Sequence, residues 1–266
     1  MNSLAGHVVV ITRRDDAAAP LESALAALGA TVRVVPTTQQ VRLTETDEIA
    51  RALRQESGYS HIVFSSPMAV RFFLESAAEI ETAAAAWRAA RIAAVGPGTA
   101  SALEEAGLEP AVTSSSGGGR ELARILLEEE KLGPGHRVLL AQSRIARPEL
   151  RSKLEAAGVA VAAIVVYDTI PVKRATIQPF LQWLAEGHTP DGITFASPSA
   201  LDAFLELTGK RGRELLESPR VGIVSIGATT SSAIGKEGLR VAAEAAEPTT
   251  EGLVAAIVRA LKENSE

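Results

Sequence analysis

Serine, threonine and glycine residues recur in four short motifs that could hold an anion. The motifs are Phe64-Ser65-Ser66-Pro67, Val95-Gly96-Pro97-Gly98-Thr99, Phe195-Ala196-Ser197-Pro198-Ser199 and Ile226-Gly227-Ala228-Thr229-Thr230. Each follows an apolar run and stands where a helix could begin. A hydroxyl there can cap the helix, and glycine lets a ligand approach backbone N–H groups that attract anions. Capping alone explains any one motif, but their paired occurrence favours anion binding.

A tyrosine and several arginines occupy comparable positions. Tyr167, one of two tyrosines, ends the apolar run 161–166 and could donate a proton to a substrate. A partly buried structural phenol is an equal alternative. Arginines that could bind carboxylates follow two other apolar runs. They are Arg13 and Arg14, directly after Thr12, and Arg144 and Arg147. Solvated surface arginine is the simplest interpretation of each one.

Several familiar chemistries lack the residues that they require. Cysteine is absent, so no thiolate nucleophile or disulfide can form, and the four histidines lack metal-ligand spacing. Gly96-Pro97-Gly98 resembles part of a dinucleotide fingerprint, but Ser101 replaces its third glycine. Neither a Walker A loop nor a Gly-x-Ser-x-Gly nucleophile elbow occurs. We therefore expect no NAD site, phosphate-binding loop or serine hydrolase chemistry.

Length and composition indicate a globular chain of about two domains, at roughly 150 residues per domain. Its 266 residues are 46% hydrophobic and 22% charged, close to a globular average. The net charge of -5 argues against a general nucleic-acid surface. Charged residues at 13–16 interrupt the first apolar run, and no apolar stretch of about 18 residues occurs. We therefore expect no secretory signal, no membrane span and a cytoplasmic location.

The chain contains a long internal repeat. At an offset of 131 residues, segment 62–75 aligns with 193–206 and eight of 14 pairs are identical. At the same offset, segment 95–108 aligns with 226–239 and six of 14 pairs are identical. Gly6-His7 also resembles Gly135-His136 at an offset of 129. A period this long predicts duplicated domains, and by itself it places a boundary near Pro134.

Each copy alternates short β-branched runs with amphipathic helical stretches. Strands are expected at 7–11, 31–35, 62–64, 92–95 and near 109–113, and helices over 20–28, from 67, from 98 and over 122–130. The polar run 114–119 is expected to be a loop. This alternation predicts the α/β class, with parallel sheets covered by helices on both faces. Ligands of such sheets gather at the carboxyl ends of the strands, where the four motifs fall.

The order and spacing of these motifs resemble those of uroporphyrinogen-III synthases over essentially the whole chain. The resemblance rests on Thr12-Arg13, Phe64-Ser65-Ser66-Pro67-Met68-Ala69-Val70, Ala94-Val95-Gly96-Pro97-Gly98-Thr99-Ala100, Val165-Val166-Tyr167, Ile193-Thr194-Phe195-Ala196-Ser197-Pro198-Ser199-Ala200 and Ile226-Gly227-Ala228-Thr229-Thr230. The sequence departs from the family at Pro67, where asparagine is frequent. It also departs at Gln142-Ser143, where an arginine-glycine pair is frequent.

The resemblance implies an exchanged domain layout that the repeat could not reveal. Residues 1–35 and 174–266 would form the first domain, and residues 44–163 the second. Segments 34–43 and 164–173 would cross between them as a two-stranded linker. The two domains would be similar α/β units with the ligand cleft between them.

The resemblance also implies an activity, the cyclisation of hydroxymethylbilane to uroporphyrinogen III. Ring D is inverted and water is lost, without metal or organic cofactor, in the biosynthesis of haem, sirohaem and cobalamin. Tyr167 is the expected general acid. The expected substrate-binding residues are Thr12, Arg13, Arg14, Ser65, Ser66, Gly96, Gly98, Thr99, Arg144, Ser197, Ser199, Gly227, Thr229 and Thr230.

Two other functions stay open from the residues alone. One is a non-catalytic two-domain protein that closes on a small anion, and the other is a nucleotide-sugar transferase, for which no nucleotide site is evident. For the enzyme, the resemblance suggests a monomer, and the charge and the lack of a long apolar stretch lead us to expect contact with neither nucleic acid nor membrane. Its partners would be the linear tetrapyrrole polycarboxylate and, transiently, the preceding enzyme of the pathway.

Overall fold

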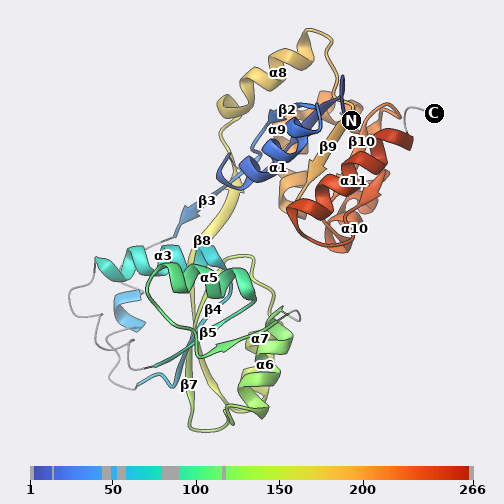
Figure 1. Ribbon diagram of the computed structural model, residues 1–266. Helices are drawn as coiled ribbons and strands as arrows, with labels where there is room; N and C mark the ends of the chain where they lie inside the picture. Colours follow the sequence, from blue (N-terminus) through green and yellow to red (C-terminus); the bar gives the residue numbers. More distant parts are fainter. Residues whose placement is uncertain are drawn as a thin grey trace. The chain divides into compact units, whose positions relative to one another are not determined.

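The computed structural model describes residues 3–13, 15–43, 49–52, 58–79, 90–115 and 118–263 (Figure 1). The chain divides into two compact units, Met1–Gln39 with Ile170–Glu266 (unit 1) and Gln40–Thr169 (unit 2). Both cuts lie inside the two segments expected to act as linkers, within β3 (Thr38–Arg42) and β8 (Ala160–Pro171). The boundary near Pro134 that the duplication alone suggested is wrong, because Pro134 lies in the middle of unit 2.

Unit 1 is built on a parallel sheet with the strand order β11-β10-β9-β1-β2. Its strands are β1 (Val8–Ile11), β2 (Thr31–Val34), β9 (Gly192–Phe195), β10 (Gly222–Ser225) and β11 (Ala243–Glu244). Its helices are α1 (Asp15–Ala27), η1 (Arg174–Ile177), α8 (Gln178–Ala185), α9 (Pro198–Glu217), α10 (Ala228–Lys236) and α11 (Thr250–Glu263). Alternate residues of β1 pack into separate hydrophobic cores on the two faces of the sheet. Val10 packs with α8, α9 and α10, whereas Val9 and Ile11 pack with α1 and α11.

Unit 2 repeats this plan with the strand order β8-β7-β4-β5-β6, to which β3 adds at the β8 edge. Its remaining strands are β4 (His61–Phe64), β5 (Arg91–Ala94), β6 (Val112–Thr113) and β7 (Arg137–Ser143). Its helices include α3 (Pro67–Ala78), α5 (Pro97–Glu105), α6 (Gly118–Glu128) and α7 (Glu149–Ala156). The pairs among β4 to β8 are parallel. β3 runs antiparallel to β8, because Leu43 N–H bonds Val166 O while Val172 N–H bonds Thr37 O.

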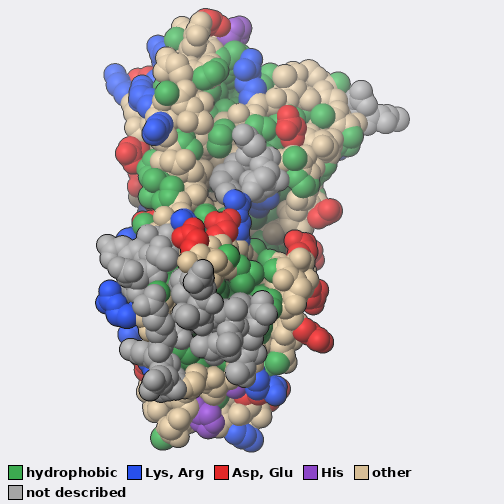
Figure 2. Space-filling model, turned by 90° about the vertical axis from the view of Figure 1, so that its left-hand side faces the viewer, with side chains coloured by type: hydrophobic (Ala, Val, Ile, Leu, Met, Phe, Trp, Pro, Cys, Tyr) green, Lys and Arg blue, Asp and Glu red, His purple; other side chains and the backbone are tan. Residues whose placement is uncertain are grey.

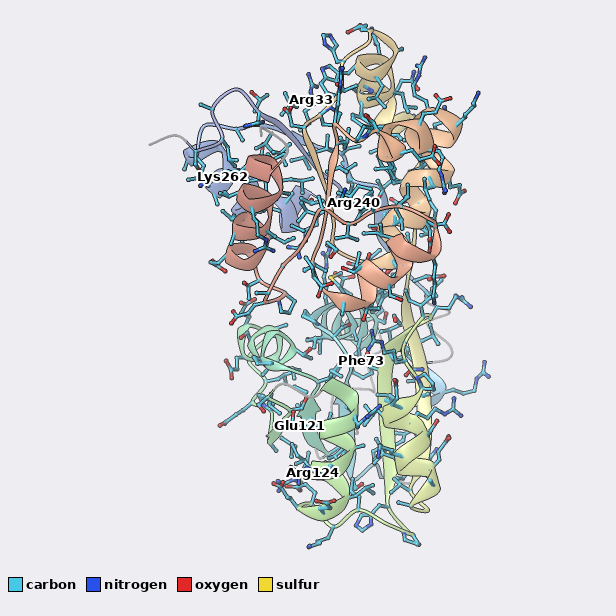
Figure 3. The ribbon with its side chains drawn as sticks, turned by 90° about the vertical axis from the view of Figure 1, so that its right-hand side faces the viewer. Arg33, Phe73, Glu121, Arg124, Arg240 and Lys262 are labelled. Carbon is cyan, nitrogen blue, oxygen red and sulfur yellow. The ribbon has the colours of Figure 1, made fainter. Side chains whose placement is uncertain are left out.

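Both faces of the unit 2 sheet are covered by helices. Ile62 and Phe64 of β4 pack on one face with α3 and α5, whereas Val63 packs on the other with α6 and α7. Phe73 of α3 meets Phe64 edge-to-face at 5.3 Å between ring centroids, and Figure 3 shows it inside the unit. The α/β class with parallel sheets and helices on both faces is therefore confirmed. None of the helices within the described ranges is long and apolar enough to cross a bilayer.

The internal repeat of the sequence is a repeat of structure. Moving β4, α3, β5, α5 and β6 forward by 131 residues brings each onto β9, α9, β10, α10 and β11 in turn. The smaller block β1-α1-β2 corresponds to β7-α7-β8 at an offset of 129. Each small block pairs with the large block of the other sequence copy, since β1 pairs with β9 and β7 pairs with β4. The two units are therefore assembled by exchange between the copies.

Two details differ from the elements predicted from the sequence. Helix α1 begins at Asp15, five residues before the predicted start at Pro20. Gly118 and Gly119, predicted as loop, belong to the first turn of α6. That turn packs closely on α7, since a Cβ at Gly119 would lie 3.1 Å from Leu150 Cβ. Tertiary contact thus stabilises a helical turn that the two glycines would not favour alone.

Candidate functional site

Unit 2 holds a cavity at the carboxyl ends of β4, β5, β7 and β8. Its volume is about 540 Å³. Most of its lining comes from the segments that leave these strands and from the first turns of α6 and α7. The lining residues are Ser65, Ser66, Val95, Gly118, Gly119, Arg120, Leu140, Gln142, Ser143, Ala146, Arg147, Glu149, Leu150 and Tyr167. The cavity occupies the edge where parallel α/β sheets bind ligands.

Ser66 joins a helix end to the tyrosine of the cavity. Its backbone is extended (φ -167°, ψ 162°), so it can serve as the N-cap of α3, and Pro67 fits the first helical position. Ser66 Oγ accepts a hydrogen bond from Ala69 N–H at 3.1 Å. The same oxygen lies 3.0 Å from Tyr167 Oη.

Tyr167 is held in place by the sheet and by an aromatic neighbour. Its side chain is buried, and its ring lies tilted against Phe72 with centroids 5.7 Å apart. The register of β7 with β8 shifts between Gln142 and Ser143, so that Ser143 pairs with Tyr167. Arg144 N–H then donates to Tyr167 O at 2.9 Å. The phenol of Tyr167 is therefore a fixed polar group in the cavity wall.

The cavity wall carries two cations and one anion. Arg120 belongs to the first turn of α6, Arg147 stands just before α7, and Glu149 is the first residue of α7. Arginines of this kind bind carboxylates in bidentate fashion. Ser65, Gln142 and Ser143 add neutral polar groups. The wall can thus accept an acidic ligand and donate a proton to it.

Arg144 lies at the same strand end but is not part of the cavity lining. Its Nε donates to Asp168 Oδ2 at 2.9 Å, and Asp168 Oδ1 accepts from Thr169 N–H at 2.8 Å. Arg147, three residues later, is a lining residue of the cavity. The predicted substrate residue Arg144 is therefore paired with Asp168 of β8, whereas Arg147 is one of the two cations in the wall.

The Val95–Thr99 motif contributes only Val95 to the cavity lining. Gly96 has φ 82°, a conformation that favours glycine, and its N–H donates to Ser114 Oγ at 3.1 Å. Thr99 is buried and donates its hydroxyl to Val95 O at 2.7 Å. Gly98 is exposed in the first turn of α5. The hydrogen bonds of Gly96 and Thr99 are thus used within the fold.

The predicted residues of unit 1 lie at the equivalent strand ends. Thr12 is buried and donates to Thr194 O at 2.7 Å. Burial lowers the pKa of Arg13 from its ordinary value, which is expected where a cation has lost hydration. Arg14 lies outside the described residues.

The two serines and the last motif of unit 1 act as helix starts. Ser197 caps α9, and its Oγ lies 3.0 Å from Ser199 Oγ. Gly227 is the N-cap residue of α10, followed by the exposed Thr229 and the buried Thr230.

Several lining residues were not among the predicted site residues. They are Gly118, Gly119, Arg120, Gln142, Ser143 and Glu149. Arg147 was considered as a possible carboxylate-binding arginine but was not among the expected substrate-binding residues. The sequence did contain one indication of these residues: a polar, glycine-rich run stands before Arg120 and precedes an amphipathic helix, as an anion-binding turn often does. Because that run was expected to be a plain loop, its residues were not predicted as part of the site.

The surface and the described side chains limit what else the site could be. Within the described ranges, no group of three or more His, Asp or Glu side chains could hold a metal ion. On the face shown in Figure 2, acidic and basic side chains are scattered over both units. An acidic ligand would therefore depend on local groups such as Arg120 and Arg147.

Known proteins resemble this chain along almost its full length. The family model described as "Uroporphyrinogen-III synthase HemD" matches residues 19–255. A chloroplastic uroporphyrinogen-III synthase of Oryza sativa subsp. japonica is 30% identical over 96% of this chain and 80% of its own length. A uroporphyrinogen-III synthase of Chlorobaculum parvum is 29% identical over 88% of this chain and 90% of its own length.

Solved structures carry the same fold. The uroporphyrinogen III synthase of Thermus thermophilus, as a triple mutant, has a TM-score of 0.62 at 22% identity, over 97% of this chain and 100% of that one. The uroporphyrinogen-III synthetase of Helicobacter pylori has a TM-score of 0.63 at 17% identity, over 94% of this chain and 97% of that one. The family model and the sequence relatives support the enzyme interpretation and not the non-catalytic anion-binding alternative. The resemblance seen in the motifs is confirmed, and the chain belongs to the uroporphyrinogen-III synthase family of tetrapyrrole biosynthesis enzymes.

Proposed function

We propose that this chain cyclises hydroxymethylbilane to uroporphyrinogen III, and that the unit 2 cavity holds part of the substrate with Tyr167 as the proton donor. One observation carries the site assignment: the Tyr167 hydroxyl and two arginines line one cavity at the carboxyl ends of the strands. The substrate is a polycarboxylate that must lose a hydroxyl, and these groups supply a proton and positive charge.

The reaction needs orientation more than strong acid–base chemistry. The C–O bond of the hydroxymethyl group breaks, and the oxygen leaves as water after accepting a proton. The substituted carbon of ring D then attacks the azafulvene cation and becomes a spiro centre. Its older bond to the methylene bridge breaks, the methylene bonds to the other α-carbon of ring D, and loss of a proton from that carbon completes the inverted ring. Because the open bilane can close unaided to isomer I, the enzyme must hold one folded conformation. Arg120 and Arg147 would bind acetate or propionate groups and fix that conformation.

The other residues predicted from the sequence fall into three groups in this proposal: a residue of the cavity wall, contacts elsewhere on the substrate, and structural residues. Ser65 joins Tyr167 in the cavity wall. Arg13, Arg14, Arg144, Gly96, Gly98, Ser197, Ser199, Gly227 and Thr229 remain predicted contacts elsewhere on the substrate. Thr12, Thr99 and Thr230 are buried, so we assign them a structural role.

Two wider expectations belong to the same proposal. One is location, for which we propose the cytoplasm. The other is transient contact with the enzyme that produces the substrate, because the substrate cyclises spontaneously to the wrong isomer. Cross-linking of the two enzymes during turnover would test the contact, and no cross-linked product at any substrate concentration would contradict it.

Isomer analysis tests the proposed activity directly. Freshly prepared hydroxymethylbilane is supplied to the protein, the products are oxidised, and the uroporphyrin isomers are separated. We expect isomer III to predominate and the bilane to disappear faster than in buffer. Isomer I alone, formed at the rate seen without protein, would contradict the proposal.

A further inference from the structure

The hydrogen bonds of Ser66 have a direction that bears on Tyr167. Ala69 N–H can only donate, so Ser66 Oγ accepts in the 3.1 Å contact between them. A hydroxyl that accepts a hydrogen bond is polarised and becomes a better donor. Tyr167 Oη lies 3.0 Å from Ser66 Oγ, and either hydroxyl could be the donor in this contact. The hydrogen bond from Ala69 N–H favours Ser66 as the donor, so that the chain of donors would run from Ala69 N–H through Ser66 to Tyr167.

This direction leaves the phenol proton available to a ligand. Tyr167 is only 7% exposed, and its ring is fixed by the tilted contact with Phe72. With its oxygen accepting from Ser66, its own proton can point to a group bound in the cavity that both side chains line. After transfer, the phenolate would accept a charge-assisted hydrogen bond from Ser66, about twice as strong as a neutral one.

We infer that Ser66 is a positioning residue for Tyr167, beyond its role as the cap of α3. It orients the phenol before proton transfer and stabilises the oxygen afterwards, so its effect is greater in the transition state than in the bound substrate. This inference rests on the proposed function. It replaces the expectation that Ser66 binds the substrate itself.

The second copy of the motif shows that capping does not require this contact. Ser197, the equivalent of Ser66, accepts from Ala200 N–H at 3.2 Å and caps α9 in the same way. Its second contact is the Ser199 hydroxyl instead of a tyrosine. The Ser66–Tyr167 pair is thus an addition to the capping motif, confined to the unit that holds the cavity.

A double-mutant cycle separates positioning from capping. Wild type, Ser66→Ala, Tyr167→Phe and the double variant are assayed for kcat, KM and melting temperature, with Ser66→Thr as the conservative rescue. Ser66→Ala should lower kcat about three- to tenfold with little change in KM, as expected for the loss of one hydrogen bond. In the Tyr167→Phe background the same change should leave kcat unaltered, although the melting temperature falls in both. Ser66→Thr should restore most of kcat.

A spectroscopic readout tests the contact without turnover. The chain has two tyrosines, so ¹³Cζ-labelled tyrosine gives one resonance each for Tyr59 and Tyr167. Ser66→Ala should move the resonance that Tyr167→Phe removes and leave the other in place.

Three outcomes would overturn the positioning role. They are an equal loss of kcat in both backgrounds, a rise of KM alone, and an unmoved Tyr167 resonance. Failure of the proposed function would appear differently, as isomer I alone from the wild-type protein.

Discussion

The two units use the same strand-end motif for different purposes. Ser66 and Ser197 each start a helix and accept the N–H three residues later, at 3.1 and 3.2 Å. In unit 2 the capping hydroxyl also meets Tyr167 in a cavity wall, whereas in unit 1 it meets Ser199. Both copies keep the capping function. In unit 2 a phenol and two arginines also line the cavity beside the cap, and we propose that the chemistry takes place there.

Replacing the phenol should have the largest effect on activity. Tyr167→Phe removes the proposed proton donor but keeps the ring against Phe72. We expect kcat to fall roughly 10- to 100-fold without being abolished, because the leaving hydroxyl can also be protonated by water. Steady-state kinetics with circular dichroism as a fold control measures this. Unchanged kcat would remove the chemical contrast between the units, whereas complete loss in a well-folded protein would contradict a mechanism that depends mainly on orientation.

Removing the cavity cations should weaken substrate binding. Arg147→Ala and Arg120→Ala should each raise KM about tenfold, the lower end for a lost charge-assisted hydrogen bond. Arg147→Lys should recover part of the loss. Arg240→Ala is the matched control, an exposed arginine of unit 1 beside the hollow at Gly222, at the amino end of β10. Equal effects of the control and of either cavity variant would show that overall charge, not the cavity, decides affinity.

The buried hydroxyls of unit 1 should matter for stability. Thr12→Val removes the donor to Thr194 O, at 2.7 Å, and leaves a buried carbonyl with a poorer partner. We expect the free energy of unfolding to fall by about 1–2 kcal/mol in urea titration. A raised KM with unchanged stability would instead place Thr12 in the substrate site and make the two units more alike.

The smallest expected difference between the units is in their response to acid. Burial lowers the pKa of His61, at the amino end of β4; Glu130 opposes that shift, and Arg91 and His136 add to it. His61 Nε2 lies 3.4 Å from Glu130 Oε2, without the geometry of a hydrogen bond. The position equivalent to His61 in unit 1 is Gly192, which does not titrate.

Since the folded pKa of His61 is below its unfolded value, the unfolded chain takes up the proton first as the pH falls. The contribution of neutral His61 to the free energy of unfolding is complete above about pH 6.5 and decreases below it. Hydrogen exchange, corrected for intrinsic rates, should show β4 losing more protection than β9 between about pH 7.5 and about pH 5.5. His61→Gln should reduce the difference. Equal loss in both strands would assign the acid effect elsewhere.

The sequence predicted the site best where one local rule decided the outcome. Ser66 and Ser197 were found because a serine followed by proline at a strand end is a helix start whatever surrounds it. Arg144 was preferred to Arg147 as a substrate-binding residue, but in the structure Arg147 lines the cavity and Arg144 is paired with Asp168. Sequence spacing alone does not show which of two neighbouring loop arginines faces the cavity. Arg120 was missed because α6 begins two residues before it, in a glycine-rich turn that is stabilised by packing on α7.

The sequence by itself determined the repeated plan: the 131-residue offset, the helix starts, the apolar strands and the α/β class all follow from residue types and local spacing. Only the tertiary structure decided which small block joins which large one. β1 and β7 are both apolar strands that suit the centre of a parallel sheet, so hydrophobic patterning permits either to pair with β4. That choice depends on side-chain packing between segments far apart in the chain. In this protein it brings β7 beside β4 and β8 beside β7, and with them Arg147 and Tyr167 to the cavity that Ser66 also lines.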